Sequence, residues 1–444
     1  MNPYPADMRA MRERLRAALR RGLIAVLDVG TSQTVCLILQ VDAAALEQAE
    51  AKGSAHDAHA ALRVVGAGIT RSRGVRFGEI ADMEDSERAI RTALERAEKS
   101  VGARVDQVIA TVSGARPRSI GAFGEVELEG EEATSRDISR ALHASDWPDR
   151  REGREVIHAM PVNFTLDGRG STPDPRGMAA KSLAVDLHAV SVDRTPLRNL
   201  AASVRRCDLE LAGVVVGSYA SGLSSLVEDE QKLGAACIDL GAGSSDIAIF
   251  LRGHLIHADS VRMGGDHLTQ DISVGLSMPM DAAERIKTFH GGAVATGLDD
   301  RELIEAPHIG ETHPADRRKI SRSALIGVIR PRLEEILEDV RRRLDSAGFQ
   351  QLPGRRIVLT GGAAQLTGIE ETAQRILGRQ VRIGRPMRIA GLPQAVSGPD
   401  CAAVVGLALH AARPQDEIWD FEPVAAFASR RRIAGAVRWF RDNW

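Results

Sequence analysis

Short apolar runs that end in small polar turns dominate the start of the chain. The apolar run 23–27 leads into a polar turn at 28–33 and then into a second apolar run, 35–41. Two apolar runs around a tight polar turn are typical of a β-hairpin. The pattern predicts further strands at 62–69 and 105–112, whereas residues 42–61 show no period and predict a loop.

A second hairpin of the same kind lies in the second half of the chain. Apolar residues 235–240 lead into a polar turn at 239–246 and then into the run 247–251. Both turns begin Asp-x-Gly and continue with small polar residues. Repetition of a whole strand–turn–strand unit predicts an internally duplicated fold. A later strand, 356–360, ends in the glycine pair of Gly361-Gly362-Ala363-Ala364.

Helical spacing of apolar residues predicts helices between these strands. We expect a helix capped by Ser86 that runs to about Ser100, a helix from Pro196 through Cys207, and helices at 218–229, 280–289 and 321–329. Pro331 suits the first position of a separate helix that follows.

Residues 113–180 differ from the rest of the chain. They contain short alternating segments, one helical stretch and a Gly/Pro-rich loop. This pattern predicts a small α+β insertion with its own core. The strand 183–192 then resumes the main pattern.

Composition identifies a globular protein with an uneven charge distribution. The 444 residues are 43% hydrophobic, 27% charged and only 3% aromatic, with a net charge of -2. Residues 1–21 and 427–444 each carry +4, which leaves -10 for the body. The acidic body argues against nucleic acid as a partner. The four cysteines form no C-x-x-C pair and predict reduced thiols in the core, and no apolar run is long enough to span a bilayer.

The extreme C-terminus has the pattern of an interfacial helix. Four apolar residues fall on one helical face and arginines flank it, with Trp439 beside the face: the residues concerned are Arg430, Arg431, Arg432, Ile433, Val437, Arg438, Trp439, Phe440, Arg441 and Trp444. A basic helix with an aromatic edge is typical of binding to anionic membrane lipid. The linker before this helix, the absence of an acidic partner face nearby and the clustering of Trp419, Trp439 and Trp444 after residue 418 favour this interpretation over a terminal helix docked on its own protein.

The N-terminal residues 1–21 also show helical spacing, at Met8, Met11, Leu15 and Ala18, with arginines around them. We expect a disordered basic arm here, with a second membrane contact as the alternative.

The two polar turns have the chemistry of a phosphate clamp. Small residues allow backbone N–H groups to face an anion, and Asp28 and Asp239 at the strand ends could hold a hydrated Mg²⁺. The chain contains neither a Walker motif G-x-x-x-x-G-K-[ST] nor a G-x-G-x-x-G fingerprint.

The order of these motifs resembles the actin, sugar-kinase and DnaK-chaperone superfamily. The stretches 72–74, 263–272, 357–366 and 380–386 narrow the resemblance to the FtsA family of bacterial cell-division proteins. The resemblance implies an α/β, actin-like (ribonuclease H-like, duplicated) ATPase fold that binds ATP and Mg²⁺. The nucleotide-binding residues it implies are Asp28, Gly30, Thr31, Ser32, Gln33, Asp239, Gly241, Gly243, Ser244, Ser245, Asp246, Gly264, Gly265, Glu284, Lys287, Gly361, Gly362, Ala363 and Gln365. The alternative for Glu284 and Lys287 is an exposed ion pair.

The resemblance also implies a division into domains. These are a basic extension (1–21), subdomain IA in two parts (22–103 and 181–217) around an inserted 1C or SHS2 domain (104–180), subdomain IIA in two parts (218–287 and 346–412) around subdomain IIB (288–345), a linker (413–426) and a membrane-targeting amphipathic helix (427–444).

Family resemblance further implies the partners. These are the C-terminal peptide of FtsZ on subdomain IIB, other copies of the chain in a filament, later division proteins through the 1C domain, and anionic lipid at the cytoplasmic face of the membrane at the septum. Arg322, Arg330 and Arg332 are candidates for the acidic groups of the FtsZ peptide, with solvated surface charge as the alternative.

One departure from the superfamily concerns hydrolysis. Hydrolysing members carry Glu or Gln after the strand at 214–216, where this chain has Gly217-Ser218-Tyr219. A serine is a poor general base, so we expect slow hydrolysis. Two other functions on the same fold remain as alternatives: a sugar-kinase-type phosphotransferase and a pilus-assembly adaptor.

Overall fold

The structure is a computed structural model of the full chain. It describes residues 6–52, 54–145, 153–310 and 318–421. The predicted membrane-targeting helix at 427–444 lies outside the described residues.

The fold is built on two five-stranded sheets with the same strand order. The first sheet has the order β11-β6-β1-β2-β3, and the second has the order β18-β17-β12-β13-β14. The strands of the first sheet are β1 (Leu23–Val29), β2 (Gln33–Val41), β3 (Leu62–Arg71), β6 (Gln107–Val112) and β11 (Glu210–Val216). The strands of the second are β12 (Ala235–Leu240), β13 (Ser245–Leu251), β14 (His254–Val261), β17 (Arg356–Thr360) and β18 (Val381–Ile383).

The strand directions repeat as well. In each sheet the hairpin and its third strand are antiparallel, while the remaining two strands run parallel to the first hairpin strand. One hydrophobic core contains the first sheet, the inserted sheet and one face of the second sheet, and a second core lies on the other face of the second sheet. The prediction of an internally duplicated fold is confirmed.

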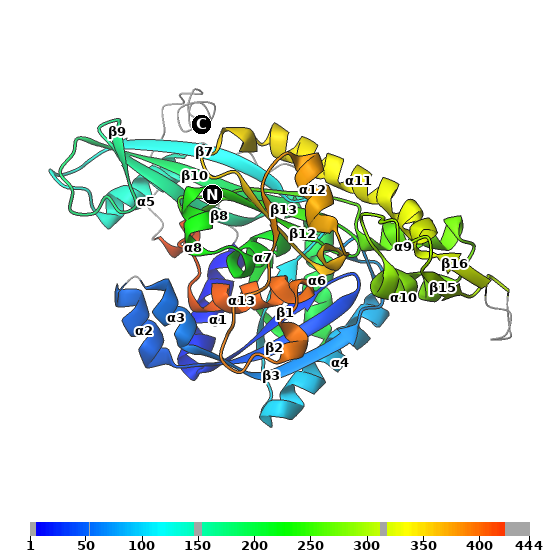
Figure 1. The fold of residues 1–444 in the computed structure, drawn as a ribbon. Helices are drawn as coiled ribbons and strands as arrows, with labels where there is room; N and C mark the ends of the chain where they lie inside the picture. The colour runs from blue at the N-terminus through cyan, green and yellow to red at the C-terminus, as the bar shows by residue number, and fades with distance from the viewer. Residues whose placement is uncertain (1–5, 53, 146–152, 311–317, 422–444) are drawn as a thin grey trace.

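Helices cover these sheets. They include α4 (Met83–Val101), which packs on β2 and β3, with α6 (Arg194–Arg206) and α13 (Ala402–Ala412), which contact strands of the first sheet. The helix α7 (Gly217–Ser225) packs on α13 and on β12, and α8 (Glu228–Leu233) packs on β13. In the second half lie α9 (Gly265–Gly275), α10 (Met280–His290), α11 (Arg322–Ser346) and α12 (Ile369–Leu377), with the small hairpin β15 (Leu303–Ala306) and β16 (Arg318–Ser321) beside them (Figure 1).

The prediction of a loop at 42–61 is wrong. The segment forms two short helices, α2 (Ala43–Lys52) and α3 (Ala55–Ala60). Only a few apolar side chains, among them Leu46, Ala49 and Ala58, are buried. This apolar face is too narrow to give a clear helical period in the sequence.

Two predicted helix starts are also wrong. Asp82, and not Ser86, caps α4, because its side chain accepts hydrogen bonds from the backbone of Glu84 and Asp85. Pro331 lies inside α11 and does not begin a helix. Proline leaves the carbonyl four residues earlier without its helical partner. That residue is Gly327, which is exposed, so water can hydrate the carbonyl while buried side chains on both sides of Pro331 hold one continuous helix.

The insertion forms a separate four-stranded sheet. Its strand order is β7-β10-β8-β9, from β7 (Arg118–Glu127), β8 (Arg154–Leu166), β9 (Arg169–Thr172) and β10 (Ser182–Asp193), with α5 (Ser135–Ala144) packed on it. The strand expected at 183–192 therefore belongs to the inserted sheet and does not resume the main one. The inserted domain therefore runs from about residue 118 to 193, and not from 104 to 180, because β6 belongs to the first main sheet and β10 to the inserted one.

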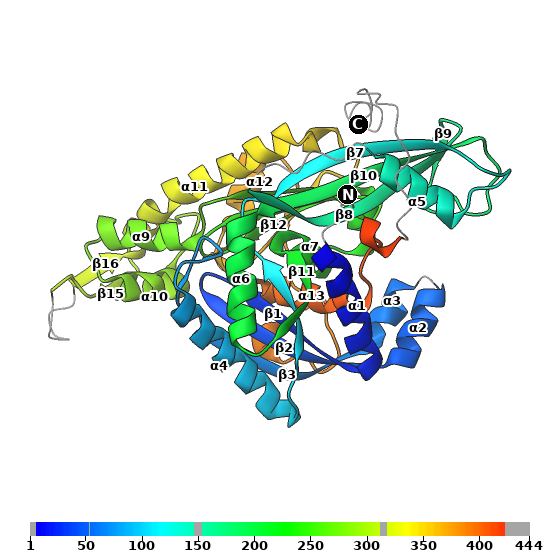
Figure 2. The same cartoon turned by 180° about the vertical axis from the view of Figure 1, so that it is seen from behind.

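Both ends of the described chain dock on the body. The arm expected to be disordered is a helix, α1 (Ala6–Arg21), with Met8, Leu15 and Leu19 buried. The segment 413–421, expected to be linker, ends in a short 3-10 helix, η6 (Ile418–Asp420), in which Trp419 is only 4% exposed. Trp419 is thus a core residue and no longer supports a membrane contact. Figure 2 shows α1 beside η6 on one side of the molecule.

The remaining sequence predictions concern thiols and membrane spans. All four cysteines are free and buried, as expected. None of the helices in the described ranges has the length and apolar character needed to cross a bilayer.

Candidate functional site

Both hairpin turns have the same backbone geometry. The N–H of Gly30 donates to the carbonyl of Gln33 at 3.0 Å, and the N–H of Gly241 donates to the carbonyl of Ser244 at 2.9 Å. Within the described residues, the N–H groups at the turn centres have no hydrogen-bond acceptor; these belong to Thr31, Ser32, Ala242 and Gly243. Unpartnered backbone N–H groups in a turn form an anion-binding concavity.

The two turns face one cavity of about 460 Å³ between the halves of the molecule. This volume is typical of small-molecule sites. Nearly all of the predicted nucleotide residues line it: Asp28, Gly30, Thr31, Ser32, Gln33, Asp239, Gly241, Gly243, Ser244, Asp246, Gly265, Glu284, Lys287, Gly361, Gly362, Ala363 and Gln365. Ser245 and Gly264 are not among its lining residues. The Ser245 hydroxyl instead donates to the carbonyl of Met263 at 2.8 Å, which ties β13 to the segment before α9.

Asp28 and Asp239 lie at equivalent positions, one residue before the end of β1 and of β12. Thr111 donates to Asp28 at 2.5 Å and Ser221 donates to Asp239 at 2.5 Å. Burial raises the pKa of Asp28, against the hydrogen bond from Thr111. Burial also raises the pKa of Asp239 to about 7, and nearby carboxylates add to the rise. A cation or a ligand rich in hydrogen-bond donors in the cavity would stabilise the ionised forms of these two buried carboxylates.

Asp246 orients the second turn. Ser244 donates to one of its carboxylate oxygens at 3.0 Å, and Ser260 donates to the other at 2.5 Å. Burial raises the pKa of Asp246 to about 6, although these hydrogen bonds oppose the rise. Asp246 therefore acts on the cavity mainly by fixing the Ser244 hydroxyl.

Close contacts hold the halves together at the turns. A Cβ atom on Gly243 would lie 2.6 Å from the Thr31 hydroxyl and 2.8 Å from the Phe77 backbone. The Thr31 hydroxyl in turn accepts a hydrogen bond from the N–H of Gly78 at 2.9 Å. Glycine at 243 is thus required for the second turn to approach the first.

The pair Glu284 and Lys287 is not a surface ion pair. The Lys287 ammonium donates to Glu284 at 2.6 Å, to the Thr269 hydroxyl at 2.7 Å and to the carbonyl of Gly265 at 2.9 Å. Lys287 is 9% exposed, and its three donors all have partners within the chain. Its direct effect is to fix the start of α9 and the carboxylate of Glu284 at the cavity wall.

Asp400 is a site residue that sequence reasoning missed. It lines the cavity, and its side chain accepts hydrogen bonds from Gln33 at 3.2 Å and from Gln365 at 3.3 Å. It links the first turn to the glycine-rich loop 361–365. Asp400 lies in a Gly-Pro-Asp turn far from both hairpins in sequence, so no local pattern identifies it.

The position expected to activate water lacks a suitable side chain. Gly217 lines the cavity, and the buried Ser218 hydroxyl has no hydrogen-bond partner among the described residues. Neither Glu nor Gln occupies this turn, so the geometry supports binding better than hydrolysis.

A metal ion in this cavity would need phosphate oxygens of a bound nucleotide to complete its coordination. In the described ranges, no group of three or more His, Cys, Asp or Glu side chains is arranged to hold a metal. Mg²⁺ retains several waters and commonly uses one or two carboxylates with substrate phosphates. Asp28 and Asp239 fit that role through water.

The three arginines proposed for an acidic peptide each contact the chain's own carboxylates. Arg322 lies 2.5 Å from Asp299, Arg330 lies 2.9 Å from Glu334, and Arg332 lies 2.7 Å from Asp271. They lie along α11, outside the lining of the cavity.

Comparison with solved structures shows an actin-like fold. The chain is similar to the PilM–PilN type IV pilus biogenesis complex, with a TM-score of 0.60 and 15% identity over 88% of this chain and 99% of that one. It is also similar to MreB5 of Spiroplasma citri bound to AMPPNP, with a TM-score of 0.51 and 15% identity over 87% and 95% of the two chains. At such identities the likeness concerns the fold alone.

Comparison with known sequences shows the family. The family profile described as cell division protein FtsA matches residues 236–406, and that of the SHS2 domain inserted in FtsA matches residues 114–191. The chain is 39% identical to cell division protein FtsA of Agrobacterium fabrum over 96% of both chains. It is 29% identical to that of Escherichia coli over 88% of this chain and 91% of the other. The chain therefore belongs to the FtsA family of cell division proteins.

Proposed function

We propose that the protein binds Mg·ATP between its two hairpins, assembles with copies of itself and tethers the FtsZ ring to the cytoplasmic face of the cell membrane at the division septum. The observation that carries the nucleotide part is the pair of turns whose unpartnered N–H groups face the same cavity. Membership of the FtsA family supports the role in division.

The lining of the cavity supports ATP as the ligand. The phosphates would lie between the turns at Gly30–Ser32 and Gly241–Ser244, with a hydrated Mg²⁺ near Asp28 and Asp239. Adenosine would face the loop at 361–363, and Glu284 would contact the ribose or base. The unpartnered N–H groups of both turns suit the negative charge of a triphosphate.

Nucleotide would act mainly as a conformational ligand. Both turns line the cavity, so a ligand that contacts both of them favours the arrangement in which the turns lie close together. The absence of a general base at Gly217 and Ser218 supports slow turnover.

Exposed apolar side chains support a docking surface on the second half. Several large apolar side chains between residues 274 and 309 of the sequence are exposed, among them Leu298, which is 75% exposed. Phe289, also 75% exposed, lies at the wall of the nucleotide cavity. Exposed apolar side chains commonly mark sites of protein association where they form one patch. We assign the FtsZ peptide and filament contacts to this region, with Arg322, Arg330 and Arg332 on α11 as candidate partners for acidic groups. The inserted domain would receive later division proteins.

The C-terminal residues 427–444 would provide the membrane contact. Their basic and aromatic composition fits the interface of an anionic bilayer. A protein attached in this way is peripheral.

Imaging on vesicles tests the whole proposal. The protein with Mg·ATP is added to anionic phospholipid vesicles, with and without FtsZ. We expect membrane-bound filaments that recruit FtsZ only when ATP is present. Phosphoryl transfer to a small sugar substrate would instead identify a kinase, and failure to bind vesicles or FtsZ would favour an adaptor of the pilus type.

A further inference from the structure

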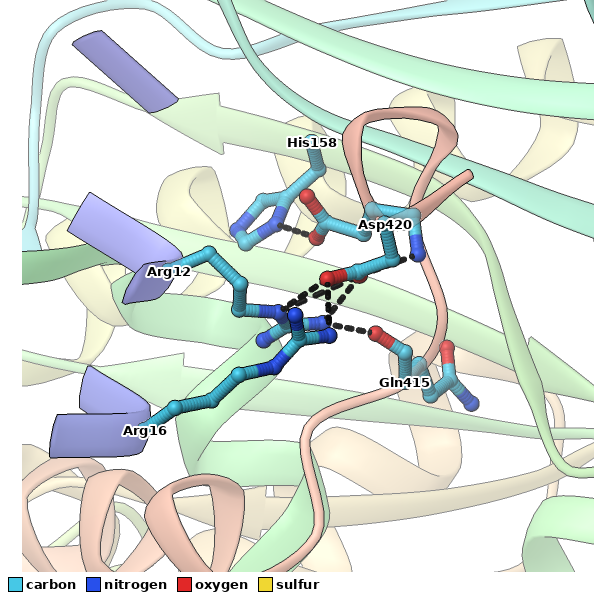
Figure 3. Close-up of polar contacts among 6 residues, drawn as sticks. Arg12, Arg16, His158, Gln415 and Asp420 are labelled. Carbon is cyan, nitrogen blue, oxygen red and sulfur yellow. Dashed lines mark hydrogen bonds and ion pairs between the residues drawn. The ribbon is translucent and has the colours of Figure 1, made fainter. Parts of the chain in front are cut away.

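The N-terminal helix α1 forms a docking surface for the last described residues of the chain. Arg12 of α1 is 9% exposed and forms a two-point ion pair with Asp420, with Nε 2.9 Å from Oδ1 and Nη2 2.7 Å from Oδ2 (Figure 3). Arg12 also donates to the carbonyl of Gln415 at 2.5 Å. A two-point arginine–carboxylate pair fixes both position and orientation.

Two further arginines of α1 extend this contact. Arg16 lies 2.9 Å from Asp420, and Arg9 donates to the carbonyl of Phe421 at 2.7 Å. The carboxylate of Asp420 also caps its own turn by accepting from the N–H of Glu417 at 3.0 Å. The sequence predicts that these arginines belong to a disordered basic arm. In the structure they bind the chain's own acidic segment.

The same segment contacts the inserted domain and, through His158 of that domain, is linked to the residue before the cavity wall. His158 of β8 contacts Glu417 through Nδ1 at 2.8 Å, and its Nε2 accepts from the N–H of Val216 at 3.1 Å. Because the N–H of Val216 can only donate, Nε2 carries no proton, and Nδ1 donates to Glu417. Val216 directly precedes Gly217, which lines the cavity.

We infer that α1 is an intramolecular clamp that fixes the point at which the C-terminal segment leaves the body. The clamp consists of Arg9, Arg12 and Arg16 on α1, residues 415–421, and His158 of the inserted domain. It holds the start of the C-terminal segment where α1, the inserted sheet and the first main sheet meet.

The clamp shortens the tether to the membrane, a consequence that rests on the membrane contact proposed for 427–444. With the clamp closed, only residues 422–426 separate the body from that contact, a reach of at most roughly 18 Å. With residues 413–421 released, the free chain would begin after α13 and could reach roughly 50 Å. The closed clamp therefore holds the body near the bilayer with its docked face toward it.

Hydrogen exchange on the full-length protein tests the clamp directly. The amides of Glu417, Asp420 and Phe421 are hydrogen-bonded in the docked segment. We expect Arg12→Gln to speed their exchange at least about tenfold, since a buried carboxylate loses its main partner. Arg20→Gln is the matched control, because Arg20 is exposed on the same helix, and should leave the exchange unchanged. Equal rates in Arg12→Gln and the unaltered protein, or an equal effect of Arg20→Gln, would overturn the inference.

Amides of β12 report whether the body stays folded. If Arg12→Gln speeds exchange there too, Asp420→Asn provides the test, since it weakens the same pair from the segment side. Fast exchange at 417–421 with slow exchange in β12 supports the clamp, and slow exchange at both sites in Asp420→Asn overturns it.

A vesicle measurement separates the clamp from the membrane contact. The four native cysteines are buried, so a dye on Gln48→Cys in α2, which is exposed, reports energy transfer to a lipid dye. We expect Arg12→Gln to float with anionic vesicles as well as the parent but with weaker energy transfer. Failure of both proteins to float refutes the membrane contact while the exchange result still decides the clamp. Equal flotation and equal transfer overturns the shortened tether.

Discussion

Gly361 and Asp239 approach so closely that no side chain fits between them. A Cβ atom on Gly361 would lie 2.3 Å from Oδ1 of Asp239, and the residue also has φ +88, which strains any other amino acid. The glycine-rich loop is therefore held against the end of β12, so that the proposed adenosine and phosphate sites meet at one place.

Gly361→Ala should weaken ATP binding at least about tenfold and lower the free energy of unfolding by roughly 2 kcal/mol, from backbone strain and displacement of Asp239. Titration with a fluorescent ATP analogue and thermal unfolding measure the two effects. Gly378→Ala is the matched control: Gly378 has φ +63, but open space surrounds its Cβ position. It should lose stability through strain and keep its affinity; a similar loss of affinity in both variants would contradict the account.

The raised pKa of Asp239 predicts a pH-dependent response to Mg·ATP. A carboxyl group with a pKa of about 7 in the folded chain binds more protons there than in the unfolded chain, where the ordinary value is about 4. Its contribution to stability is fully present below pH 4 and is lost as pH rises to about 7. Mg·ATP offsets that loss only where Asp239 is ionised. The rise in melting temperature on adding Mg·ATP should therefore be larger at pH 8 than at pH 6.

Asp239→Asn provides the control for this pH effect, because it retains any titration of the nucleotide itself. We expect a smaller rise in melting temperature that differs little between the two pH values. A parent protein that responds equally at pH 6 and pH 8 would show that Asp239 does not face the bound metal.

Lys287→Met should disturb the cavity wall without touching either turn. It removes three hydrogen bonds and leaves Glu284 and the carbonyl of Gly265 without their cation. We expect roughly tenfold weaker ATP binding and a loss of about 1–3 kcal/mol in the free energy of unfolding. The neighbouring exposed Arg285→Met should change neither quantity. Unchanged affinity for ATP in Lys287→Met would show that the pair of Glu284 and Lys287 does not contribute to the nucleotide site.

Deletion of residues 427–444 should release the protein from anionic vesicles. The deleted residues carry +4 and the aromatic edge that would enter the interface. Flotation measures the effect, and neutral vesicles and raised salt provide the controls for the electrostatic part. A truncated protein that still floats with anionic vesicles would place the membrane contact elsewhere.

The hairpins and the duplication could be predicted from the sequence because each is encoded locally. Apolar runs flank each polar turn, and the spacing of Asp28 and Gly30 repeats in Asp239 and Gly241. Packing of the two halves then places both turns at one cavity. The prediction that Pro331 begins a helix, which also rested on local sequence, is wrong. Buried side chains along α11 stabilise one continuous helix in spite of the proline.

Contacts between distant segments could not be predicted in this way. Asp400 joins the site only because α13 packs beneath the first sheet and places its preceding turn at the cavity. The arginines of α1 had the composition of a disordered basic arm, and only the fold pairs Arg12 with Asp420, more than four hundred residues away. Trp419 likewise had the composition of a membrane anchor and is a core residue.

Hydrogen exchange with and without Mg·ATP tests the central claim most directly. The account predicts that ATP slows exchange at both turns together, at Thr31 and Ser32 and at Ala242 and Gly243, because these N–H groups gain phosphate oxygens as acceptors. Protection of only one turn, or of neither at saturating Mg·ATP, would contradict a nucleotide site shared by the two halves.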